Sequence, residues 1–306
     1  MIKALILARG LGTRMQRDEA GAHLTSEQQQ LAQRGAKGLM PICGRPFLDF
    51  LIAELLDAGV TQIALVIGPE HDMLREYGGS LNAKFQQPNP PAPFPKREGG
   101  DVNTRTPPFL LGKGAGGLGS PCIHFCLQEQ PLGTANAVLA GRDFTGDDDA
   151  IVLNSDNLYS TETLKLLVEQ PRGASYVAGY ERDALIGRSN LEAERVKRLA
   201  VVQADEGGTM TCIIEKPDQP DNFATNGRVL LSLNCFRFAP RIFEACAKVG
   251  KSPRGEYELP EAVVYLKDVL GEPVRVLPTT GLFIDMTSRG DVAAVERLLI
   301  HRKLGF

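Results

Sequence analysis

A glycine-containing loop directly follows the first apolar segment of the chain. Residues 7–15 read Leu-Ala-Arg-Gly-Leu-Gly-Thr-Arg-Met. Two glycines let the backbone approach a ligand closely and expose its N–H groups to phosphate oxygens, and the guanidinium of Arg14 adds a bidentate positive charge. The dinucleotide fingerprint needs a third glycine where Met15 stands, and the P-loop needs Gly-Lys-Ser/Thr. Taken alone, the loop fits either a phosphate site or an ordinary tight turn.

A second segment makes the phosphate site the better interpretation. Residues 37–48 read Lys-Gly-Leu-Met-Pro-Ile-Cys-Gly-Arg-Pro-Phe-Leu. Together the two segments resemble the sugar-1-phosphate nucleotidyltransferases, which make NDP-sugars and include the glucose-1-phosphate thymidylyl- and uridylyltransferases. That family pairs a G-x-G-T-R loop with a K-x-L-x-P-I-x-x-[RK]-P segment.

The resemblance continues in order along nearly the whole chain. The further matching segments are 128–137 (Gln-Glu-Gln-Pro-Leu-Gly-Thr-Ala-Asn-Ala, base recognition), 154–157 (Asn-Ser-Asp-Asn, metal aspartate at a strand end), 215–217 (Glu-Lys-Pro, sugar phosphate), 255–262 (Gly-Glu-Tyr-Glu-Leu-Pro-Glu-Ala, a helix start) and 283–287 (Phe-Ile-Asp-Met-Thr, a second metal aspartate). Any one match could arise by chance, but their number and order make the resemblance specific.

The resemblance implies a role for each matched residue. The expected catalytic residues are Arg14, Lys37 and Asp156, and Asp156 and Asp285 are expected to share one Mg²⁺. The expected nucleotide-binding residues are Leu7, Ala8, Gly10, Leu11, Gly12, Thr13, Gln128, Pro131, Gly133 and Thr134. The expected sugar-phosphate residues are Glu215, Lys216 and Asn234.

The chemistry of nucleotidyl transfer agrees with these residue types. The reaction brings two anions together, so their charge must be neutralised and the attacking oxygen aligned with the α-phosphorus. Arg14 and the amides of residues 10–12 would hold the triphosphate, and Arg14 would stabilise the leaving pyrophosphate. Lys37 would lie between the α-phosphate and the acceptor phosphate. Because the sugar phosphate itself attacks, we expect no covalent intermediate.

Each residue also has a purely structural explanation. Lys37 could be a solvated lysine near a helix start, and Asp156 or Asp285 could cap a following helix. Glu215 and Lys216 could form an exposed ion pair before a proline. The order of the motifs favours the functional interpretation.

Base choice is inferred from Gln128, which stands where pyrimidine-using relatives have a glutamine. Its amide offers one donor and one acceptor group, which suits uracil or thymine, so UTP or dTTP is expected. Two alternatives stay open: a cytidylyltransferase acting on a non-sugar phosphate, and a non-catalytic regulatory subunit that binds NDP-sugar.

The sequence departs from the family pattern at four places. Arg9 stands where the family usually has Gly or Ala, so a long cation lies beside the base and phosphate loop. Ala200 replaces a common glycine, residues 232–234 (Ser-Leu-Asn) replace N-T-G, and residues 286–288 (Met-Thr-Ser) replace G-T. Most of these changes concern the acceptor side, so the sugar stays open.

Composition limits the partners. The chain has 306 residues, is 43% hydrophobic and carries a formal net charge of −3, which gives no basic field for nucleic acid. Apolar runs last only a few residues, and the first one stops at Arg9, so neither a membrane span nor a signal peptide is expected. Six scattered cysteines indicate reduced thiols in a cytoplasmic protein, without zinc or disulfides. A homo-oligomer is compatible with the relatives.

The elements that must position these residues follow an α/β pattern, because short apolar runs alternate with helical periodicity. Strands are expected at 2–7, 63–67, 151–153, 174–180, 199–204, 211–214 and 229–238, and helices at 47–58, 240–249, 258–269 and 292–303. The resemblance implies a Rossmann-like α/β/α sandwich of the nucleotide-diphospho-sugar transferase type, with a mixed, mainly parallel sheet. We expect one domain over 1–306 with its site at the carboxyl ends of the strands.

Two segments interrupt this pattern. Residues 17–35 contain a short Gln/Ala-rich helix that Thr25 or Ser26 could cap, and this insertion is a candidate lid over the site. Residues 80–121 are rich in Pro and Gly. Such a composition cannot offset its ordering entropy by burial, so we expect a mobile insertion there.

Overall fold

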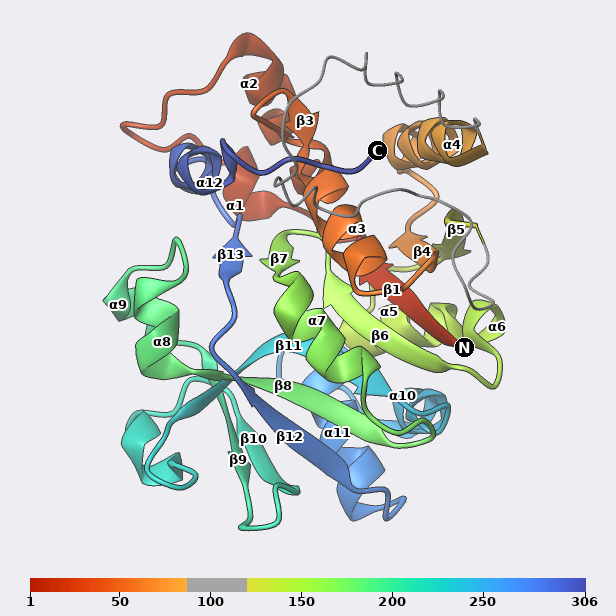
Figure 1. Ribbon diagram of the computed structural model, residues 1–306, viewed down its shortest axis with the longest axis vertical. Helices are drawn as coiled ribbons and strands as arrows, with labels where there is room; N and C mark the ends of the chain where they lie inside the picture. The colour runs from red at the N-terminus through yellow and green to blue at the C-terminus, as the bar shows by residue number, and fades with distance from the viewer. Residues whose placement is uncertain (87–119) are drawn as a thin grey trace, which may run out of the picture.

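Nine strands form one mixed sheet in the computed structural model, which describes residues 1–86 and 120–306 (Figure 1). The strand order is β10-β9-β11-β6-β1-β4-β5, and β8 pairs with both β11 and β12. The strands are β1 (Ile2–Leu7), β4 (Gln62–Ile67), β5 (Cys122–Leu127), β6 (Asp149–Asn154), β8 (Ser175–Glu181), β9 (Ala200–Ala204), β10 (Met210–Ile214), β11 (Leu230–Phe238) and β12 (Val274–Thr279).

Four neighbouring strands, β6, β1, β4 and β5, run parallel and form one half of the sheet, with β5 at its edge. The sequences of β1 and β4 are almost continuously apolar, which is typical of parallel strands buried on both faces. Parallel strands end at the same edge of the sheet, so the segments that follow them meet there. The predicted fold class, a Rossmann-like α/β protein with a mixed sheet, is confirmed.

The other half of the sheet is mainly antiparallel and is organised by β11. This strand pairs antiparallel with β6, β8 and β9, and its register is irregular between Ser232 and Phe236. Strands β9 and β10, both expected from the sequence, form a hairpin closed by the N–H of Asp205 donating to the carbonyl of Thr209 at 2.8 Å. The irregular stretch of β11 lies near the same edge of the sheet as the parallel strand ends.

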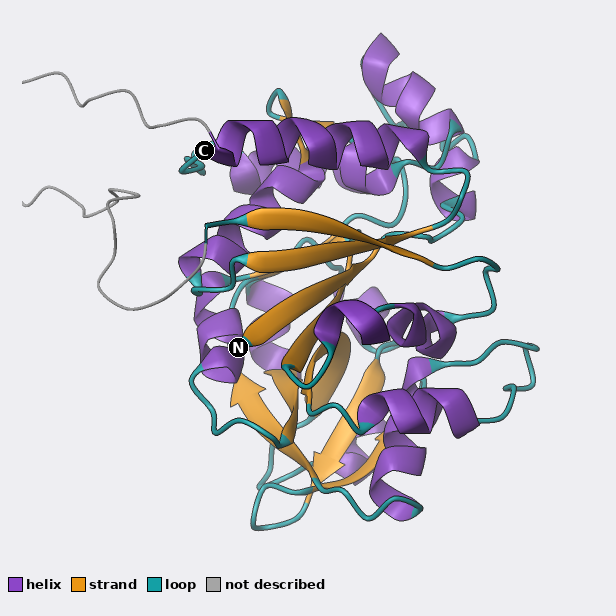
Figure 2. Ribbon diagram, turned by 90° about the vertical axis from the view of Figure 1, so that its right-hand side faces the viewer, coloured by secondary structure: helices purple, strands orange, loops and turns teal. Residues whose placement is uncertain are grey.

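Helices cover both faces of the sheet (Figure 2). One hydrophobic cluster joins one face of the sheet to α3 (Phe47–Asp57), α4 (Asp72–Gln86), α7 (Thr161–Val168) and α12 (Asp291–Leu299). The second cluster joins the other face to α5 (Thr134–Ala140), α10 (Ile242–Lys248) and α11 (Leu259–Asp268). The chain therefore has the three layers expected of an α/β/α sandwich. Within the described ranges, no helix combines the length and apolarity needed to cross a bilayer.

Short elements connect these layers. They are α1 (Thr13–Gln16), α2 (Ser26–Gln33), the 3-10 helices η1 (Lys37–Leu39) and η2 (Pro220–Phe223), α6 (Arg142–Thr145), α8 (Arg182–Gly187) and α9 (Ala193–Val196). Two small ladders complete the fold, β2 (Pro41–Ile42) with β3 (Arg45–Pro46) and β7 (Asn157–Tyr159) with β13 (Phe283–Asp285).

The two predicted insertions have different outcomes. Helix α4 continues to Gln86, so residues 80–86 are helical and do not belong to a Pro/Gly-rich excursion. Residues 87–119 of that insertion lie outside the described residues, and the single domain over 1–306 stays a prediction.

Helix α2 is fixed to the body of the protein. Thr25 caps it in a capping box with Gln28, as one of the two predicted capping residues. The Gln28 side chain is buried and donates to the carbonyl of Pro41 at 2.8 Å and to Glu296 at 3.0 Å. A lid role for this segment stays a prediction.

A buried ion pair fastens the antiparallel half of the sheet to the parallel half. Arg237 on β11 is fully buried, and its Nε donates to Asp149 on β6 at 3.0 Å. Its Nη1 donates to the carbonyls of Leu167 and Gln170, both at 2.8 Å. These bonds tie the carboxyl end of α7 to the sheet.

We expect Arg237→Ala to lower the free energy of unfolding by about 3–5 kcal/mol, because it leaves the buried charge of Asp149 without its cation and removes a donor from two carbonyls. Urea denaturation measures this. Arg172→Ala is the control, since Arg172 is largely exposed where it pairs with Asp148 and should contribute less than about 1 kcal/mol. An equal loss of unfolding free energy in the two variants would contradict the structural role of the Arg237–Asp149 pair.

Candidate functional site

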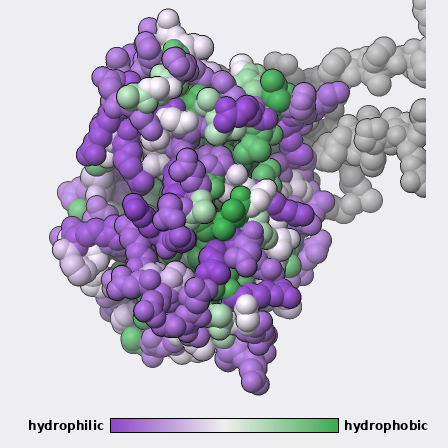
Figure 3. Space-filling model, turned by 90° about the vertical axis from the view of Figure 1, so that its left-hand side faces the viewer, coloured by the Kyte–Doolittle hydropathy of each residue, from purple (hydrophilic) through white to green (hydrophobic). Residues whose placement is uncertain are grey.

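The predicted site residues gather at the carboxyl ends of the parallel strands. The segments that follow β1, β5 and β6 are residues 8–15, 128–134 and 155–156. The N–H of Ser155 donates to the carbonyl of Leu7 at 3.2 Å, which extends the strand ladder into the site. The left-hand face of Figure 1, where α1, α9 and α12 lie, is mostly hydrophilic with hydrophobic residues gathered near its middle (Figure 3).

The loop after β1 presents backbone donors and a cation. Leu7 and Ala8 are buried beneath it, whereas Leu11, Thr13 and Arg14 are exposed. The N–H groups of residues 10–12 donate to no backbone carbonyl of a described residue. Free N–H groups beside an exposed arginine are what a bound phosphate chain requires.

A contact between two glycines holds this loop against the segment that carries Lys37. Gly12 has a left-handed backbone with φ of 60°, and a Cβ on it would lie 2.4 Å from the carbonyl oxygen of Gly35. Gly35 also has a positive φ, of 69°. A side chain at Gly12 would collide with the Gly35 backbone, and one at Gly35 would lie 2.7 Å from the carbonyl oxygen of Leu11. The contact therefore fixes where η1 begins relative to the loop.

Lys37, the first residue of η1, reaches the end of β6. Its Nζ lies 2.7 Å from Asp156 Oδ2, and the lysine side chain is only 14% exposed. The alternative explanation of Lys37 as an ordinary solvated lysine is therefore wrong. Asp156 Oδ1 keeps no partner among the described residues.

Asp285 lies beside Asp156 because β13 pairs antiparallel with β7. The pairing sets Asp285 opposite Asn157, and the N–H of Met286 donates to the carbonyl of Asp156 at 2.9 Å. Asn157 Nδ2 also donates to Asp285 Oδ1 at 3.1 Å. The two aspartates, distant in sequence, are thus brought together at the sheet edge, with an amide between them.

Both oxygens of Asp285 are already hydrogen-bonded. Oδ1 accepts from Asn157 and from the hydroxyl of Thr287 at 2.8 Å, and Oδ2 pairs with Arg195 at 2.7 Å. Burial raises the pKa of Asp285 and the nearby charge of Asp156 raises it further, whereas the charge of Arg195 opposes the rise. Arg195 is thus the cation that compensates Asp285.

The donor set fits magnesium. In the described part of the chain, no three or more His, Cys, Asp or Glu side chains cluster as a metal site. Mg²⁺ commonly uses one or two carboxylates and completes its shell with water and substrate phosphates, so Asp156 and Asp285 suit it. Arg195 must move or share Oδ2 if Asp285 is to bind the ion directly.

Gln128 occupies the end of β5 with its amide fixed. It is buried, and its Nε2 donates to the carbonyl of Gly133 at 3.1 Å and to Asn136 Oδ1 at 2.9 Å. A carbonyl only accepts, so Nε2 must face Gly133 and Oε1 must face the other way. Gln128 can therefore offer an acceptor to a ligand.

The segment 128–134 packs on the predicted helix start at 255–262. A Cβ on Gly133, whose φ is 115°, would lie 2.5 Å from the carbonyl oxygen of Tyr257. The hydroxyl of Thr134 accepts from the N–H of Leu259 at 2.8 Å, so this side chain holds α11 in place. Pro131 is exposed beside them.

Arg9 is a cation with partners on two other segments. Its Nε and Nη2 donate to the two carboxylate oxygens of Glu70 at 3.1 and 3.2 Å, and its Nη1 donates to the carbonyl of Gln128. Its side chain is only 7% exposed. Arg9 thus lies beside the loop, as expected, and these three hydrogen bonds fix the orientation of its guanidinium.

The predicted acceptor residues lie at the same edge, beyond β11. Glu215 and Lys216 follow β10 and are exposed, and Lys216 has a left-handed backbone with φ of 46°. Asn234 lies in the irregular part of β11 with φ of 55°, and the hydroxyl of Tyr159 donates to the neighbouring carbonyl of Leu233 at 2.8 Å. One strand, β9, separates the two groups.

Sequence reasoning missed two arginines that support the site. Arg195 bridges Asp285 and Asp291, with the second distance 2.6 Å. Arg289 is buried, and its Nε and Nη2 donate to the carbonyls of Met15 and Gln16 at 2.9 and 3.1 Å. Arg289 therefore holds the end of α1, the helix that carries Arg14.

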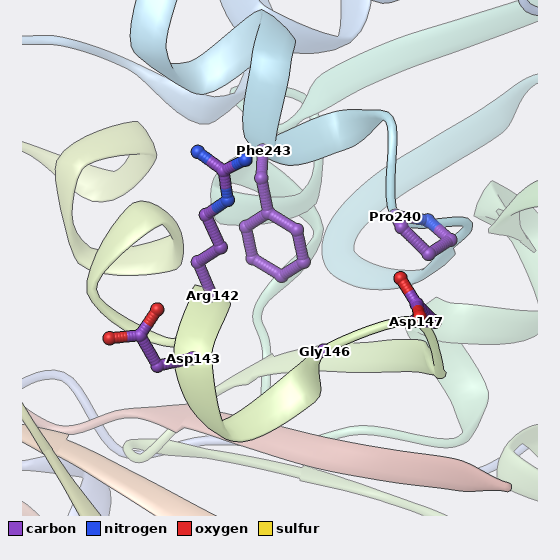
Figure 4. Close-up of a pocket in the computed structure, with 6 residues that line it drawn as sticks. All are labelled: Arg142, Asp143, Gly146, Asp147, Pro240 and Phe243. Carbon is purple, nitrogen blue, oxygen red and sulfur yellow. The ribbon is translucent and has the colours of Figure 1, made fainter.

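A cavity lies at the opposite edge of the sheet from the site. It has a volume of about 360 Å³ and is lined by Arg142, Asp143, Gly146, Asp147, Pro240 and Phe243 (Figure 4). Asp147 precedes β6 and Pro240 follows β11, so the cavity borders the amino ends of the parallel strands. None of the predicted site residues lines it, and it carries no part of the site.

Comparison with known proteins comes from sequence and from structure. Residues 3–269 match the nucleotidyl transferase family. The chain is 26% identical, over 99% of its length and 67% of the relative's, to a low-salt glycan biosynthesis nucleotidyltransferase of Haloferax volcanii. It is 25% identical, over 98% of its length and 66% of the relative's, to a glucose-1-phosphate thymidylyltransferase of Streptomyces griseus. The chain thus spans about two thirds of the length of these two relatives.

A solved structure shares the fold. It is a UDP-glucose pyrophosphorylase from Acinetobacter baumanii, which superposes with a TM-score of 0.64 at 20% identity and covers 100% of this chain and 96% of that one. The resemblance to the sugar-1-phosphate nucleotidyltransferases that the motifs indicate is confirmed.

We expect Arg289→Ala to loosen α1, because two carbonyls at its end lose their donors. Hydrogen exchange of residues 13–20 should become faster, and trypsin should cleave after Arg14 or Arg17 more readily. Arg297→Ala, an exposed arginine of α12, is the matched control and should change neither rate. Unchanged exchange in Arg289→Ala would contradict the supporting role.

Proposed function

The chain belongs to the nucleotidyl transferase family, and on this basis we propose that it couples a nucleoside triphosphate, UTP or dTTP by preference, to a sugar 1-phosphate. The products are an NDP-sugar and pyrophosphate. The observation that carries the proposal is the meeting of Lys37, Asp156 and Asp285 at the strand edge where the glycine loop presents Arg14.

The reaction is a direct displacement at the α-phosphorus. An oxygen of the sugar phosphate forms the new bond to that phosphorus, and the bond to the oxygen that bridges the α- and β-phosphates breaks. The negative charge that develops on the leaving pyrophosphate needs a fixed cation. Arg14 would supply it, together with the N–H groups of residues 10–12.

Lys37 serves the phosphates on both sides of the bond that forms. Its Nζ is held at 2.7 Å from Asp156, so the ammonium is fixed in place before substrate arrives. A fixed charge stabilises the transition state without reorganisation cost during the reaction. Lys37 would therefore reduce the charge repulsion between the two phosphates as they approach each other.

Asp156 and Asp285 would hold a Mg²⁺ ion. When bound, the ion would neutralise phosphate charge and orient the triphosphate. Asp156 keeps Oδ1 available, whereas Asp285 would have to exchange part of its bond with Arg195.

The base and the sugar are bound on opposite sides of this centre. Gln128 Oε1 would accept from the ring N–H of uracil or thymine, since its Nε2 is already used. Lys216 would pair with the acceptor phosphate, and Glu215 and Asn234 would bind sugar hydroxyls. The departures at Ala200 and Asn234 leave the identity of the sugar to experiment.

A substrate screen tests the proposal. Pyrophosphate release is measured for UTP, dTTP, CTP, ATP and GTP with a panel of sugar 1-phosphates, phosphocholine and polyol phosphates, with Mg²⁺ and with EDTA. We expect release with UTP or dTTP and a sugar 1-phosphate, abolished by EDTA. Release only with CTP and a non-sugar phosphate would indicate a cytidylyltransferase, and no release with any pair would indicate a non-catalytic subunit.

We expect Lys37→Met to lower kcat/KM by about 10²–10³-fold, the loss typical of removing one group that stabilises the transition state. Lys165→Met, at an exposed position on α7, is the matched control and should retain activity. Thermal unfolding of both variants checks that they fold. A loss of less than about threefold in folded Lys37→Met would remove this residue from the mechanism.

A further inference from the structure

We propose that Arg9 selects the base of the triphosphate, with its guanidinium presenting N–H donors beside the Gln128 Oε1 acceptor. The inference rests on the proposed function and deepens it. Together the two side chains would recognise a base edge on which a carbonyl oxygen adjoins a ring N–H, as in uracil, thymine and guanine.

The guanidinium is locked across the end of β4. Glu70 holds it through two oxygens at 3.1 and 3.2 Å, and the carbonyl of Gln128 holds it from the end of β5. The intervening Gly68 leaves room for it, because a Cβ there would lie 2.3 Å from Arg9 Nε and 2.4 Å from the Glu70 carboxylate. Arg9 therefore lies between two predicted nucleotide-binding segments.

A nucleoside bound to both segments must pass over the end of β4, where the Arg9 guanidinium lies. The phosphate loop follows β1 and Gln128 follows β5, and β4 lies between these strands. Neighbouring strands are about 4.8 Å apart, so a nucleoside that joins the loop to Gln128 spans roughly 10 Å over the end of β4. That is where the Arg9 guanidinium lies.

The hydrogen-bonding groups left over define what the base must offer. A guanidinium has five N–H donors, and Arg9 uses three of them on Glu70 and Gln128. Gln128 uses Nε2 and keeps Oε1. A donor beside an acceptor complements O4 and N3–H of uracil, whereas cytosine presents the reverse pattern of an amino group beside a bare ring nitrogen.

The alternative role for Arg9 is a further cation for the triphosphate. Its pairing with Glu70 neutralises the charge locally, and its Nη1 donates to the carbonyl of Gln128 at the end of β5. If Arg9 bound the phosphates, its substitution would lower kcat/KM for every triphosphate by the same factor. If Arg9 recognised the base, its substitution would change the ratio of the kcat/KM values for UTP and CTP. The two roles can therefore be distinguished.

The test compares UTP with CTP, which have the same size and charge. The measured quantity is the ratio of their kcat/KM values in the wild type, Arg9→Gly and Arg9→Lys. Glycine is the residue common in the resembling family, and lysine keeps the charge but loses the planar fork. We expect the wild type to prefer UTP and each variant to lower the ratio about 10- to 100-fold.

Arg172→Ala, remote from the site, is the control for loss of an arginine and should leave the ratio unchanged. Binding of UMP and CMP by calorimetry gives the same comparison without turnover. Equal losses for both nucleotides, or an unchanged ratio in both folded variants, would overturn the inference while the proposed function stands. A wild type that releases no pyrophosphate with any pair would overturn both.

Discussion

Two aspartates that lie close together at a half-buried edge must each be compensated by a cation, and the site is organised around this balance. The pairing of β7 with β13 sets Asp285 beside Asp156, and their like charges disfavour ionisation. Lys37 compensates one and Arg195 the other. Lys37 belongs to η1 and Arg195 to α9. Two segments far apart in sequence are therefore needed to compensate the two aspartates.

The centre of the fold could be predicted from the sequence because its strands are buried on both faces. Strands β1 and β4 are apolar almost throughout and lie at almost their expected bounds, and β6 was expected only at its apolar residues 151–153. Strand β5 was not predicted; it is the edge of the sheet, and only Ile123 and Cys126 of it are buried. Helix α4 contains Gly78, which normally argues against a helix, but here a Cβ would lie 2.5 Å from the Phe125 ring.

The site residues that belong to sequence motifs could be predicted. The residues that pair with them from distant parts of the chain could not. Asp156, Asp285 and Lys37 belong to recognisable segments, so their meeting could be expected. Arg195 pairs with Asp285 across 90 residues, and nothing local distinguishes it from a solvated arginine. The same holds for Arg289, and for Glu70 as the partner of Arg9. Long-range charge pairing leaves no periodic signal in a sequence.

The contact between Gly12 and Gly35 has a consequence for how this protein can vary. The two glycines touch, so everything between them leaves and re-enters the body at nearly one point. Arg14 and the buried Met15 and Gln28 constrain α1 and α2, but the mostly exposed residues 20–23 between the two helices can be lengthened or exchanged with little change in loop-closure entropy. Relatives and engineered versions could therefore carry different grafts here while the phosphate loop and η1 keep their mutual placement.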